Sequence, residues 1–541
     1  MSRREAVLSA LLIFVVAIAI RAFFAAQIVF PKPEDTAYYV GVAQNLLEGR
    51  GLVSDALWSY STPPLIFPRP AFEVWLPLPT WLAAIPMALF GASFASAQLS
   101  SMVAGAIVPV LAWRIAADVA EERGLGTERA RTLALGTGLA CAVYLPLLLH
   151  SALPDSTMPF AALALACCLL MARIARDPRG AALTDPRLVS LGVALGLAAL
   201  TRNEAAWLAF VWVVIAWTTR PATVQQRLRM IGVVGALALA IFAPWALRNW
   251  MEFGSPLPGQ AITNAFSVTG FDIFAWNDPP TLSRYLAVGP ARLVEMRIDG
   301  FWHNLGSVLL LPGFPISLIG FVALPWQARA RTLRPLLLLS LITLLVTSLV
   351  FPVATTWGTF LHAAGPFHVL LVISALLALD AGLARLGNRL GWTRPVAWLG
   401  VGLAVFSSVL FSAALLPTFG SGSRGTAELY EQLGARMAAV GRPITNDSEV
   451  VISNFPIWVA ETQDTSTLAL PDEPADDVLE LARTFGARYL ILTNPESEHW
   501  PAELAPDGSR RDCFAPVDLG GWTGPDADPL QGTTVYEIVC P

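Results

Sequence analysis

The sequence predicts a polytopic α-helical membrane protein that carries a small α/β domain at its C-terminal end. Of the 541 residues, 55% are hydrophobic and only 14% are charged, and the mean hydropathy is +0.58. A soluble domain has about 25% charged residues, so this composition indicates a chain largely surrounded by lipid. Beyond about residue 418 the sequence becomes polar and acidic. We therefore expect a transmembrane domain at 1–417 and a separate domain at 418–541.

About eleven apolar runs predict membrane crossings. They are 6–29, 93–117, 132–150, 157–175, 188–201, 203–218, 230–247, 304–325, 335–351, 366–384 and 395–417. The first run lacks a convincing cleavage site, which favours a retained helix over a signal peptide. Residues 188–218 are interrupted at Thr201–Glu204, and one long helix would place Arg202 in mid-bilayer at a cost of several kcal/mol. We therefore expect a hairpin of two short helices there.

The arginines predict which connections face the cytoplasm. Six clusters alternate with arginine-poor connections, and they lie at 3–4, 114–131, 173–187, 220–229, 329–334 and 385–394. The positive-inside rule places these clusters in the cytoplasm. The N-terminus is then cytoplasmic, and the first loop (31–92) and the tail lie outside an inner or plasma membrane. Within that loop, 74–90 contains three prolines, which favours a juxtamembrane helix over a crossing.

Strand and helix patterns alternate along the tail. Helices are expected at 427–440, 456–462 and 476–485, and strands at 450–453, 488–493 and 533–539. Cys513 and Cys540 flank the last segment, and an oxidising exterior would favour a disulfide between them. The alternative is two unpaired thiols.

Three carboxylates lie at predicted outer ends of apolar runs, where a charge is costly unless it faces water or a polar site. Glu34 and Asp35 lie at the start of a segment in which apolar residues recur at helical spacing, and Asp155 lies just before the apolar run 157–175. Each could equally be an ordinary helix-capping acid. The stronger argument for a site is that both acidic positions are predicted on one face of the membrane. Two adjacent carboxylates could also bind a divalent cation, but this pattern alone is weak evidence.

Arginines at outer helix ends could hold an anion. Arg202, and Arg248 beside Asn249, are placed where a guanidinium could bind a phosphate bidentately. The alternative is that each snorkels to the interface. Further outer-face candidates are Arg69, His362 and His368. The arginines are dispersed among apolar spans, unlike the basic surface of a nucleic-acid-binding protein.

Six short motifs occur in order at the predicted outer side, within residues 10–385. They are Glu34-Asp35-x-x-Tyr38-Tyr39, Ala43-x-Asn45-Leu46-x-x-Gly49-x-Gly51, Pro154-Asp155-Ser156, Leu200-Thr-Arg-Asn-Glu204, Arg248-Asn249-Trp-x-x-Phe253-Gly254-x-Pro256-x-Pro258 and Gly358-Thr-Phe-x-His362. No single motif is decisive. Their order, spacing and predicted sidedness together resemble the C-type superfamily of integral-membrane glycosyltransferases. That group includes protein mannosyltransferases (glycosyltransferase family 39) and the aminoarabinose transferases that modify lipid A.

The resemblance implies an inverting transferase whose donor is a polyprenyl-phosphate sugar and whose acceptor is a glycan, lipid or protein. One acid of the Glu34–Asp35 pair would be the general base. Arg202 and Arg248 would stabilise the phosphate leaving group, and Asp155 would orient the acceptor or share a metal. Further substrate-binding candidates are Tyr38, Tyr39, Arg69, Asn249 and His362.

Two expectations stay open within this resemblance. Many relatives have Asp-Glu where this chain has Glu34-Asp35, so the identity of the base is open; its spacing to the tyrosines favours Asp35. Metal use varies within the superfamily, and the ligands of any divalent ion would be Glu34, Asp35 and Asp155.

The main alternative is a transporter or flippase of a lipid or lipid-linked sugar, because broken helices and intramembrane charges also serve transport. Against it, no two similar halves are evident, and the polar residues gather at one face. A non-catalytic assembly or sensor protein would leave the acids and outer arginines without a role. No motif specifies the sugar or the acceptor.

Overall fold

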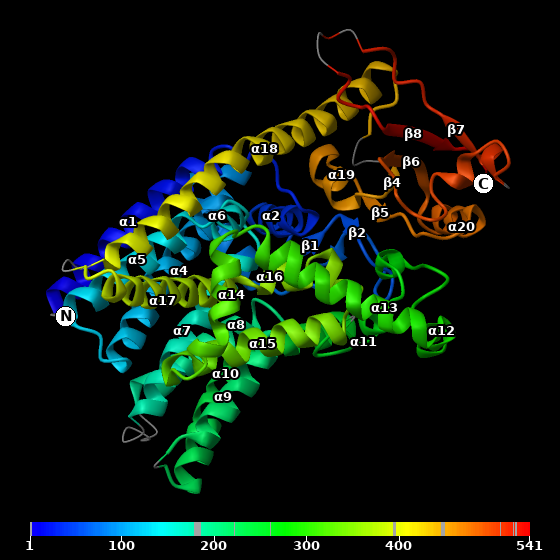
Figure 1. The fold of residues 1–541 in the computed structure, drawn as a ribbon. Helices are drawn as coiled ribbons and strands as arrows, with labels where there is room; N and C mark the ends of the chain where they lie inside the picture. The colour runs from blue at the N-terminus through cyan, green and yellow to red at the C-terminus, as the bar shows by residue number, and fades with distance from the viewer. Residues whose placement is uncertain are drawn as a thin grey trace.

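The computed structural model describes residues 3–177, 185–220, 222–259, 261–392, 396–444, 449–508, 510–522, 524 and 527–540. A helical bundle forms one part of the molecule, and a small sheet with its helices lies at the other end (Figure 1). The predicted fold class is confirmed. Two arginines of the predicted cytoplasmic clusters, Arg179 and Arg394, lie outside the described residues.

Among the described residues, seven helices are long and apolar enough to cross a membrane. They are α1 (Arg3–Ala25), α4 (Phe94–Glu122), α7 (Thr157–Arg176), α10 (Val224–Phe253), α15 (Arg334–Leu349, with the preceding turn η4, Arg331–Leu333), α17 (Gly365–Arg389) and α18 (Ala397–Ala439). The bent pair α5 (Thr127–Val143) and α6 (Leu145–Ser151) would make an eighth span. The other predicted crossings correspond to the short apolar helices α8 (Pro186–Ala199), α9 (Ala205–Thr218) and α14 (Ile316–Gln327). The number of crossings stays a prediction.

At two places the helix breaks agree with prediction, whereas the position of these segments relative to the membrane stays a prediction. The segment with three prolines forms a separate short helix, α3 (Leu78–Phe90), which starts beside Pro77 and Pro79. Proline is tolerated in a first helical turn because its missing N–H would have no partner there. The run 188–218 forms two short helices, α8 and α9, which are separated by residues 200–204.

A buried arginine supports the bend of 54° between α5 and α6. Pro146 lacks the N–H that would bond to the carbonyl of Ala142, which leaves that carbonyl without its helical donor. Arg21 of α1 donates to Ala142 O at 3.2 Å and to Ser151 Oγ at 2.9 Å. The bend is therefore held from the neighbouring helix, and it positions the end of α6.

The first outer loop and the connections between the later helices contain short elements. They are α2 (Glu34–Leu47), β1 (Val53–Ser54), β2 (Ala56–Leu57), β3 (Arg69–Pro70), α11 (Ala261–Ala265), η2 (Gly270–Phe274), α12 (Leu282–Ala287), α13 (Gly289–Trp302), the π-helix η3 (His303–Leu310), η5 (Ala354–Trp357) and α16 (Thr359–Ala363). Strands β1 and β3 form a small antiparallel pair.

The tail folds as a mixed sheet with helices, as its pattern predicts. Its elements are β4 (Val450–Ser453), α19 (Pro456–Gln463), β5 (Thr467–Ala469), α20 (Ala475–Phe485), β6 (Ala487–Thr493), η6 (Ala502–Leu504), η7 (Arg511–Cys513), β7 (Phe514–Pro516) and β8 (Thr533–Ile538). The strand order is β2-β5-β4-β6-β8-β7. The contacts from β2 to β6 are parallel, and those of β8 with β6 and β7 are antiparallel. A disulfide joins Cys513 to Cys540.

Two features tie the tail to the rest of the chain. Helix α18 continues without a break through the predicted domain boundary at 417/418, with Pro417 inside it. Strand β2 comes from the first outer loop, and Ala56 and Leu57 pair with Thr467 and Leu468 of β5. The first loop therefore supplies an edge strand to the sheet of the tail. The division into two domains at this boundary stays a prediction.

Candidate functional site

The first turn of α2 carries both Glu34 and Asp35. Adjacent helical residues project about 100° apart, so the two carboxylates face different neighbours. Asp35 lies beside His362 of α16, whereas Glu34 lies against α19 of the tail. The acid pair therefore does not form one two-carboxylate site.

His362 lies between two carboxylates that are 120 residues apart in the chain. Its Nε2 is 3.2 Å from Asp35 Oδ2, and its Nδ1 is 3.5 Å from Asp155 Oδ2. The Thr157 hydroxyl lies 2.7 Å from the same Nδ1. The two acidic positions, which are predicted to lie on one face of the membrane, thus lie close together in the structure with a histidine between them.

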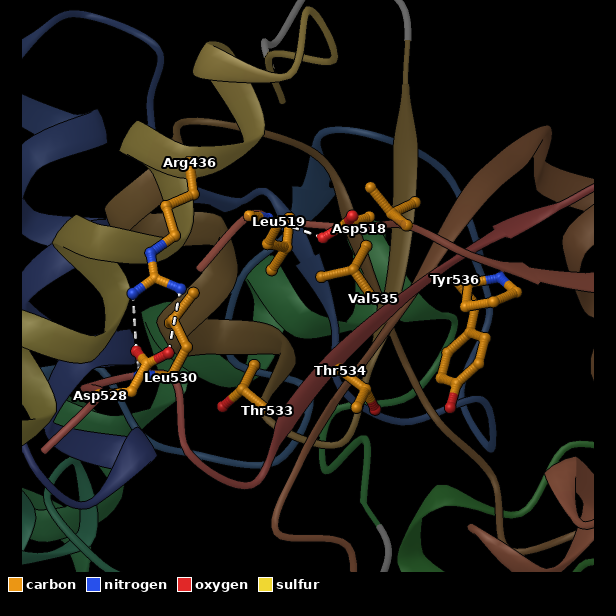
Figure 2. Close-up of a pocket in the computed structure, with 12 residues that line it drawn as sticks. Arg436, Asp518, Leu519, Asp528, Leu530, Thr533, Thr534, Val535 and Tyr536 are labelled. Atoms are coloured by element: carbon orange, nitrogen blue, oxygen red, sulfur yellow. Dashed lines mark hydrogen bonds and ion pairs between the residues drawn. The ribbon is translucent and has the colours of Figure 1, made fainter. Parts of the chain in front are cut away.

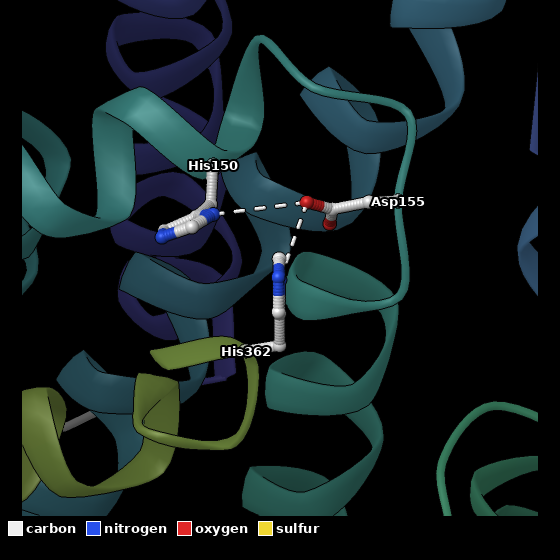
Figure 3. Close-up of side chains that lie close together, drawn as sticks. All are labelled: His150, Asp155 and His362. Atoms are coloured by element: carbon white, nitrogen blue, oxygen red, sulfur yellow. Dashed lines mark ion pairs between the residues drawn. The ribbon is translucent and has the colours of Figure 1, made fainter. Parts of the chain in front are cut away.

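Asp155 occupies the connection between α6 and α7 and is fully buried. Its Oδ1 accepts the backbone N–H of Thr157 at 2.7 Å, so the residue stabilises the start of α7 as an ordinary capping acid would. Its Oδ2 faces two imidazoles, His362 and, at 3.7 Å, His150 (Figure 3). One oxygen thus has a structural role, and the other points into a polar cluster.

The two carboxylates of this cluster have pKa values that are shifted in opposite directions. Burial raises the pKa of Asp35 above its usual value, although the positive charges of His362 and Arg202 oppose the shift. Burial also acts to raise the pKa of Asp155, but its contacts with His150 and His362 outweigh burial and hold that pKa below its usual range. Burial lowers the pKa of His362, yet the two carboxylates raise it overall. Asp35 is therefore the better proton acceptor of the two.

Arg202 lies in the turn between α8 and α9 and faces the same cluster. Its Nε and Nη2 bind both carboxylate oxygens of Glu204 at 3.0 and 2.8 Å. It also donates to Ser156 Oγ at 2.8 Å and to Thr359 O at 3.2 Å. A guanidinium has five N–H groups, so these contacts with described residues leave one for a ligand. The Ser156 hydroxyl also contacts Tyr39, which places Tyr39 at this site.

A cavity of about 480 Å³ adjoins the cluster at His362. Pro33 lines it next to the acid pair, and His303 and Ser307 of η3 line another part of its wall with Trp357. Val308 and Leu361 contribute apolar surface. Such a mixture of apolar walls with a few polar groups is typical of small-molecule sites.

Glu34 links α2 to the tail. Its Oε1 accepts the backbone N–H of Ile457, in the first turn of α19, at 2.8 Å. Burial raises its pKa from 4.5 to about 8, although the N–H groups of Ile457 and Trp458 oppose the shift. Its position suits a contact between α2 and α19 better than a part in the Asp35 cluster.

The remaining predicted site residues form a second group, within the first outer loop and on the helix packed against it. Arg69 is fully buried, pairs with Glu73 at 3.3 Å and donates to two backbone carbonyls of its own loop. The Tyr38 hydroxyl accepts the backbone N–H of Phe72 at 2.7 Å. These contacts hold the loop in shape.

Arg248 and Asn249 belong to this second group. Arg248 Nη1 donates to Ala71 O at 2.7 Å and to Asn249 Oδ1 at 3.4 Å. Its guanidinium also lies over the ring of Trp245, 5.0 Å from the centroid. The structure thus gathers Asp35, Tyr39, Asp155, Arg202 and His362, and it places Arg248 against the first outer loop.

Sequence reasoning missed His150. A lone histidine at the end of an apolar run usually packs in a core, so the residue gave little signal by itself. Its position five residues before Asp155, across a short connection, was the available clue.

A second, smaller cavity lies in the tail. It has a volume of about 240 Å³ and lies beside β8 (Figure 2). Arg436 of α18 lines it and binds both carboxylate oxygens of Asp528, at 2.7 and 3.1 Å.

Comparisons with known proteins agree with this architecture. A family model described as dolichyl-phosphate-mannose-protein mannosyltransferase matches residues 69–247. No curated protein sequence matches the chain. Crystal structures of ArnT from Cupriavidus metallidurans, in the apo state and bound to undecaprenyl phosphate, are each 15% identical to this chain with a TM-score of 0.53. The matches cover 98% of this chain and 97% and 98% of the two ArnT chains.

A third similar structure is the Archaeoglobus fulgidus oligosaccharyltransferase tethered with an acceptor peptide. It is 13% identical with a TM-score of 0.47, and the match covers 91% of this chain and 69% of that one.

The chain is a multi-pass membrane protein that resembles the C-type glycosyltransferase superfamily. More particularly, its fold is similar over nearly its whole length to that of ArnT.

Proposed function

We propose that this protein is a membrane glycosyltransferase that moves a sugar from a polyprenyl-phosphate donor to an acceptor at the outer face of the membrane. The observation that carries the proposal is the convergence of Asp35, Asp155 and Arg202 around His362, beside a cavity of about 480 Å³. The family match and the ArnT-like fold support the class of reaction. The ArnT structure with undecaprenyl phosphate supports a donor of this kind.

Asp35 is the proposed general base. An acceptor hydroxyl attacks the anomeric carbon, its proton passes to the Asp35 carboxylate, and the bond from carbon to the phosphate oxygen breaks. Attack on the side opposite the phosphate inverts the anomeric carbon. General base assistance of this kind contributes about 10²–10⁴ in rate. The raised pKa of Asp35 suits a proton acceptor, and the contact with His362 holds its carboxylate in place.

Arg202 is the proposed partner of the departing phosphate. Its charge lies at the cluster, and its position is fixed by Glu204, Ser156 and Thr359. A pre-positioned cation stabilises charge that develops on a leaving group without reorganising during the reaction. Arg248 contacts the first outer loop instead, so we assign the phosphate to Arg202.

The Asp35→Asn variant tests this proposal. We expect it to reduce transfer of radiolabelled sugar from a polyprenyl-phosphate donor into an envelope extract by about 10²–10⁴, with donor binding unchanged. Asp507→Asn, which removes an exposed carboxylate of the tail, serves as the matched control. Full turnover by Asp35→Asn would refute the base assignment. A wild-type protein that moves the donor between leaflets but labels no acceptor would favour the transporter alternative.

A further inference from the structure

Three side chains point ligand atoms at one spot inside the cluster. His150, Asp155 and His362 each offer one atom, and these atoms all lie within 4.8 Å of one another. Figure 3 shows both imidazoles directed at the same carboxylate oxygen of Asp155, from the end of α6 and from α16. All three residues are buried, with at most 7% of their surface exposed.

Two of the three atoms are buried without a hydrogen-bond partner among the described residues. They are His150 Nδ1 and Asp155 Oδ2. A buried polar atom without a partner costs about 1–3 kcal/mol, more when it is charged. Two such atoms facing each other at 3.7 Å are too far apart to bond directly, but an ion between them would satisfy both.

Two of the three distances between ligand atoms are close to those of tetrahedral coordination, and the third, between His150 and His362, is within 4.8 Å. Ligand atoms bound to zinc at about 2.1 Å in a tetrahedron lie about 3.4 Å apart. Asp155 Oδ2 is 3.7 Å from His150 Nδ1 and 3.5 Å from His362 Nδ1. Small side-chain adjustments would therefore close the site.

The second ring nitrogen of His362, Nε2, has the kind of partner that is usual for a metal-binding histidine. Its Nε2 faces Asp35 Oδ2 at 3.2 Å, so Nε2–H can donate to that carboxylate while Nδ1 keeps a free lone pair. Metal-binding histidines usually donate their other N–H to a carboxylate or carbonyl, which fixes the tautomer. The Thr157 hydroxyl lies 2.7 Å from the same Nδ1 and could donate to its lone pair in the metal-free state.

We propose that His150 Nδ1, Asp155 Oδ2 and His362 Nδ1 bind one zinc ion. Two imidazoles and one carboxylate are typical zinc ligands, whereas magnesium and calcium prefer oxygen ligands alone. The site differs from the three carboxylates that the sequence suggested, because Glu34 faces α19. A bound ion would hold His362 neutral and keep its Nε2–H directed at Asp35. The proposal goes beyond the transferase reaction, and bound metal can be measured without any assay of sugar transfer.

Metal content of the full-length protein tests the proposal. The protein is purified in detergent with a histidine-free affinity tag from cells grown with added zinc, then dialysed and analysed by mass spectrometry for metals. We expect about one zinc per chain in the wild type and near-complete loss in His150→Gln. His303→Gln, which changes a cavity-lining histidine outside the cluster, is the matched control and should keep its zinc. When cobalt replaces zinc, the wild type should show the intense visible absorption of a tetrahedral site, and His150→Gln should not.

A folding defect is separated from a ligand defect by His150→Cys. A thiolate is also a zinc ligand, so this variant should retain the metal that His150→Gln loses, with both eluting as the wild type in gel filtration. A wild type without zinc, or His150→Gln with the wild-type zinc content, would overturn the proposal. Loss of zinc in His303→Gln as well would also count against a site at these three residues.

Discussion

The adjacent acids Glu34 and Asp35 have different surroundings, so substitutions at the two positions should affect transfer activity differently. Glu34 accepts a backbone N–H from α19, whereas Asp35 contacts His362. Glutamine at position 34 keeps an accepting oxygen, so we expect Glu34→Gln to retain most of the transfer activity. Asp35→Asn removes the proposed base and should lose nearly all of it. A Glu34→Gln enzyme as impaired as Asp35→Asn, measured by initial rates of sugar transfer, would move the base to position 34.

The same residue predicts a pH effect on stability. Burial raises the pKa of Glu34 from 4.5 to about 8, so the folded protein holds this proton over a range in which the unfolded chain has released it. Stability then falls as the pH rises between these two values. Glu34→Gln removes this penalty, and its thermal midpoint should exceed that of the wild type increasingly between about pH 4.5 and pH 8. A difference that does not vary with pH in detergent unfolding scans would contradict the shift.

The close packing of helix α14 against α17 gives a prediction about stability. A Cβ added at Gly320 of α14 would lie 2.1 Å from the Leu371 carbonyl oxygen of α17, and backbone there cannot move aside easily. Small residues allow membrane helices to approach this closely. Gly320→Ala should therefore destabilise the protein by about 1–3 kcal/mol.

The matched control for this change is Gly382→Ala in α17, where nothing lies within 4 Å of the added Cβ. It should leave stability unchanged or raise it slightly, since alanine favours the helix. Thermal unfolding of both variants in the same detergent compares them. Equal midpoints would show that α14 and α17 do not pack as closely as described.

Elements with a strong local pattern were predictable. The strand at Val450–Ser453 and the helix that follows Pro456 agree with prediction because their apolar periodicity and proline position are local signals. Strand β2 has two residues and forms only through its partner in the tail, so its own sequence carries no such pattern. The break before α6 was missed as well, because the run 132–150 is apolar throughout and Pro146 was its only marker.

The sequence predicted candidate residues of the site and their shared side of the membrane, but not which side chains contact one another. Helix-end position identified Asp35, Asp155 and Arg202 as candidates, and the structure brings all three together. Arg248 met the same criterion but contacts the first outer loop, because helix-end position does not specify which way a side chain turns. The pairing of His150 with His362 depends on a fold that joins residues 212 positions apart, and no local pattern encodes it.

The orientation of the whole molecule is testable through its amines. Lys32 is the only lysine, it is exposed, and it lies in the first loop beside Trp458 of the tail. If that loop is outside, a membrane-impermeant amine reagent should label Lys32 on intact spheroplasts. Lys32→Arg is the control and should remain unlabelled there. Labelling of Lys32 only in inverted vesicles would reverse the proposed orientation.

The sheet of the tail includes a strand from the first outer loop, so the tail and the candidate site are mechanically connected. Residues 56–57 pair with β5, and Glu34 of the same loop caps α19. A change in the tail can therefore reach α2 through two separate contacts. Contacts of the tail therefore extend across the predicted boundary at 417/418 to the first outer loop.

Helix α18 has 43 residues, which is about 64 Å of helix at 1.5 Å per residue. The hydrocarbon core of a bilayer is about 30 Å thick. If the apolar first half of α18 spans the membrane as predicted, roughly half of the helix stands clear of lipid and extends toward the sheet (Figure 1). A span tilts when the thickness of its membrane changes, and a long helix displaces its far end further for the same tilt. Lipids of different acyl length should therefore alter the turnover rate in proteoliposomes, with a maximum at one bilayer thickness.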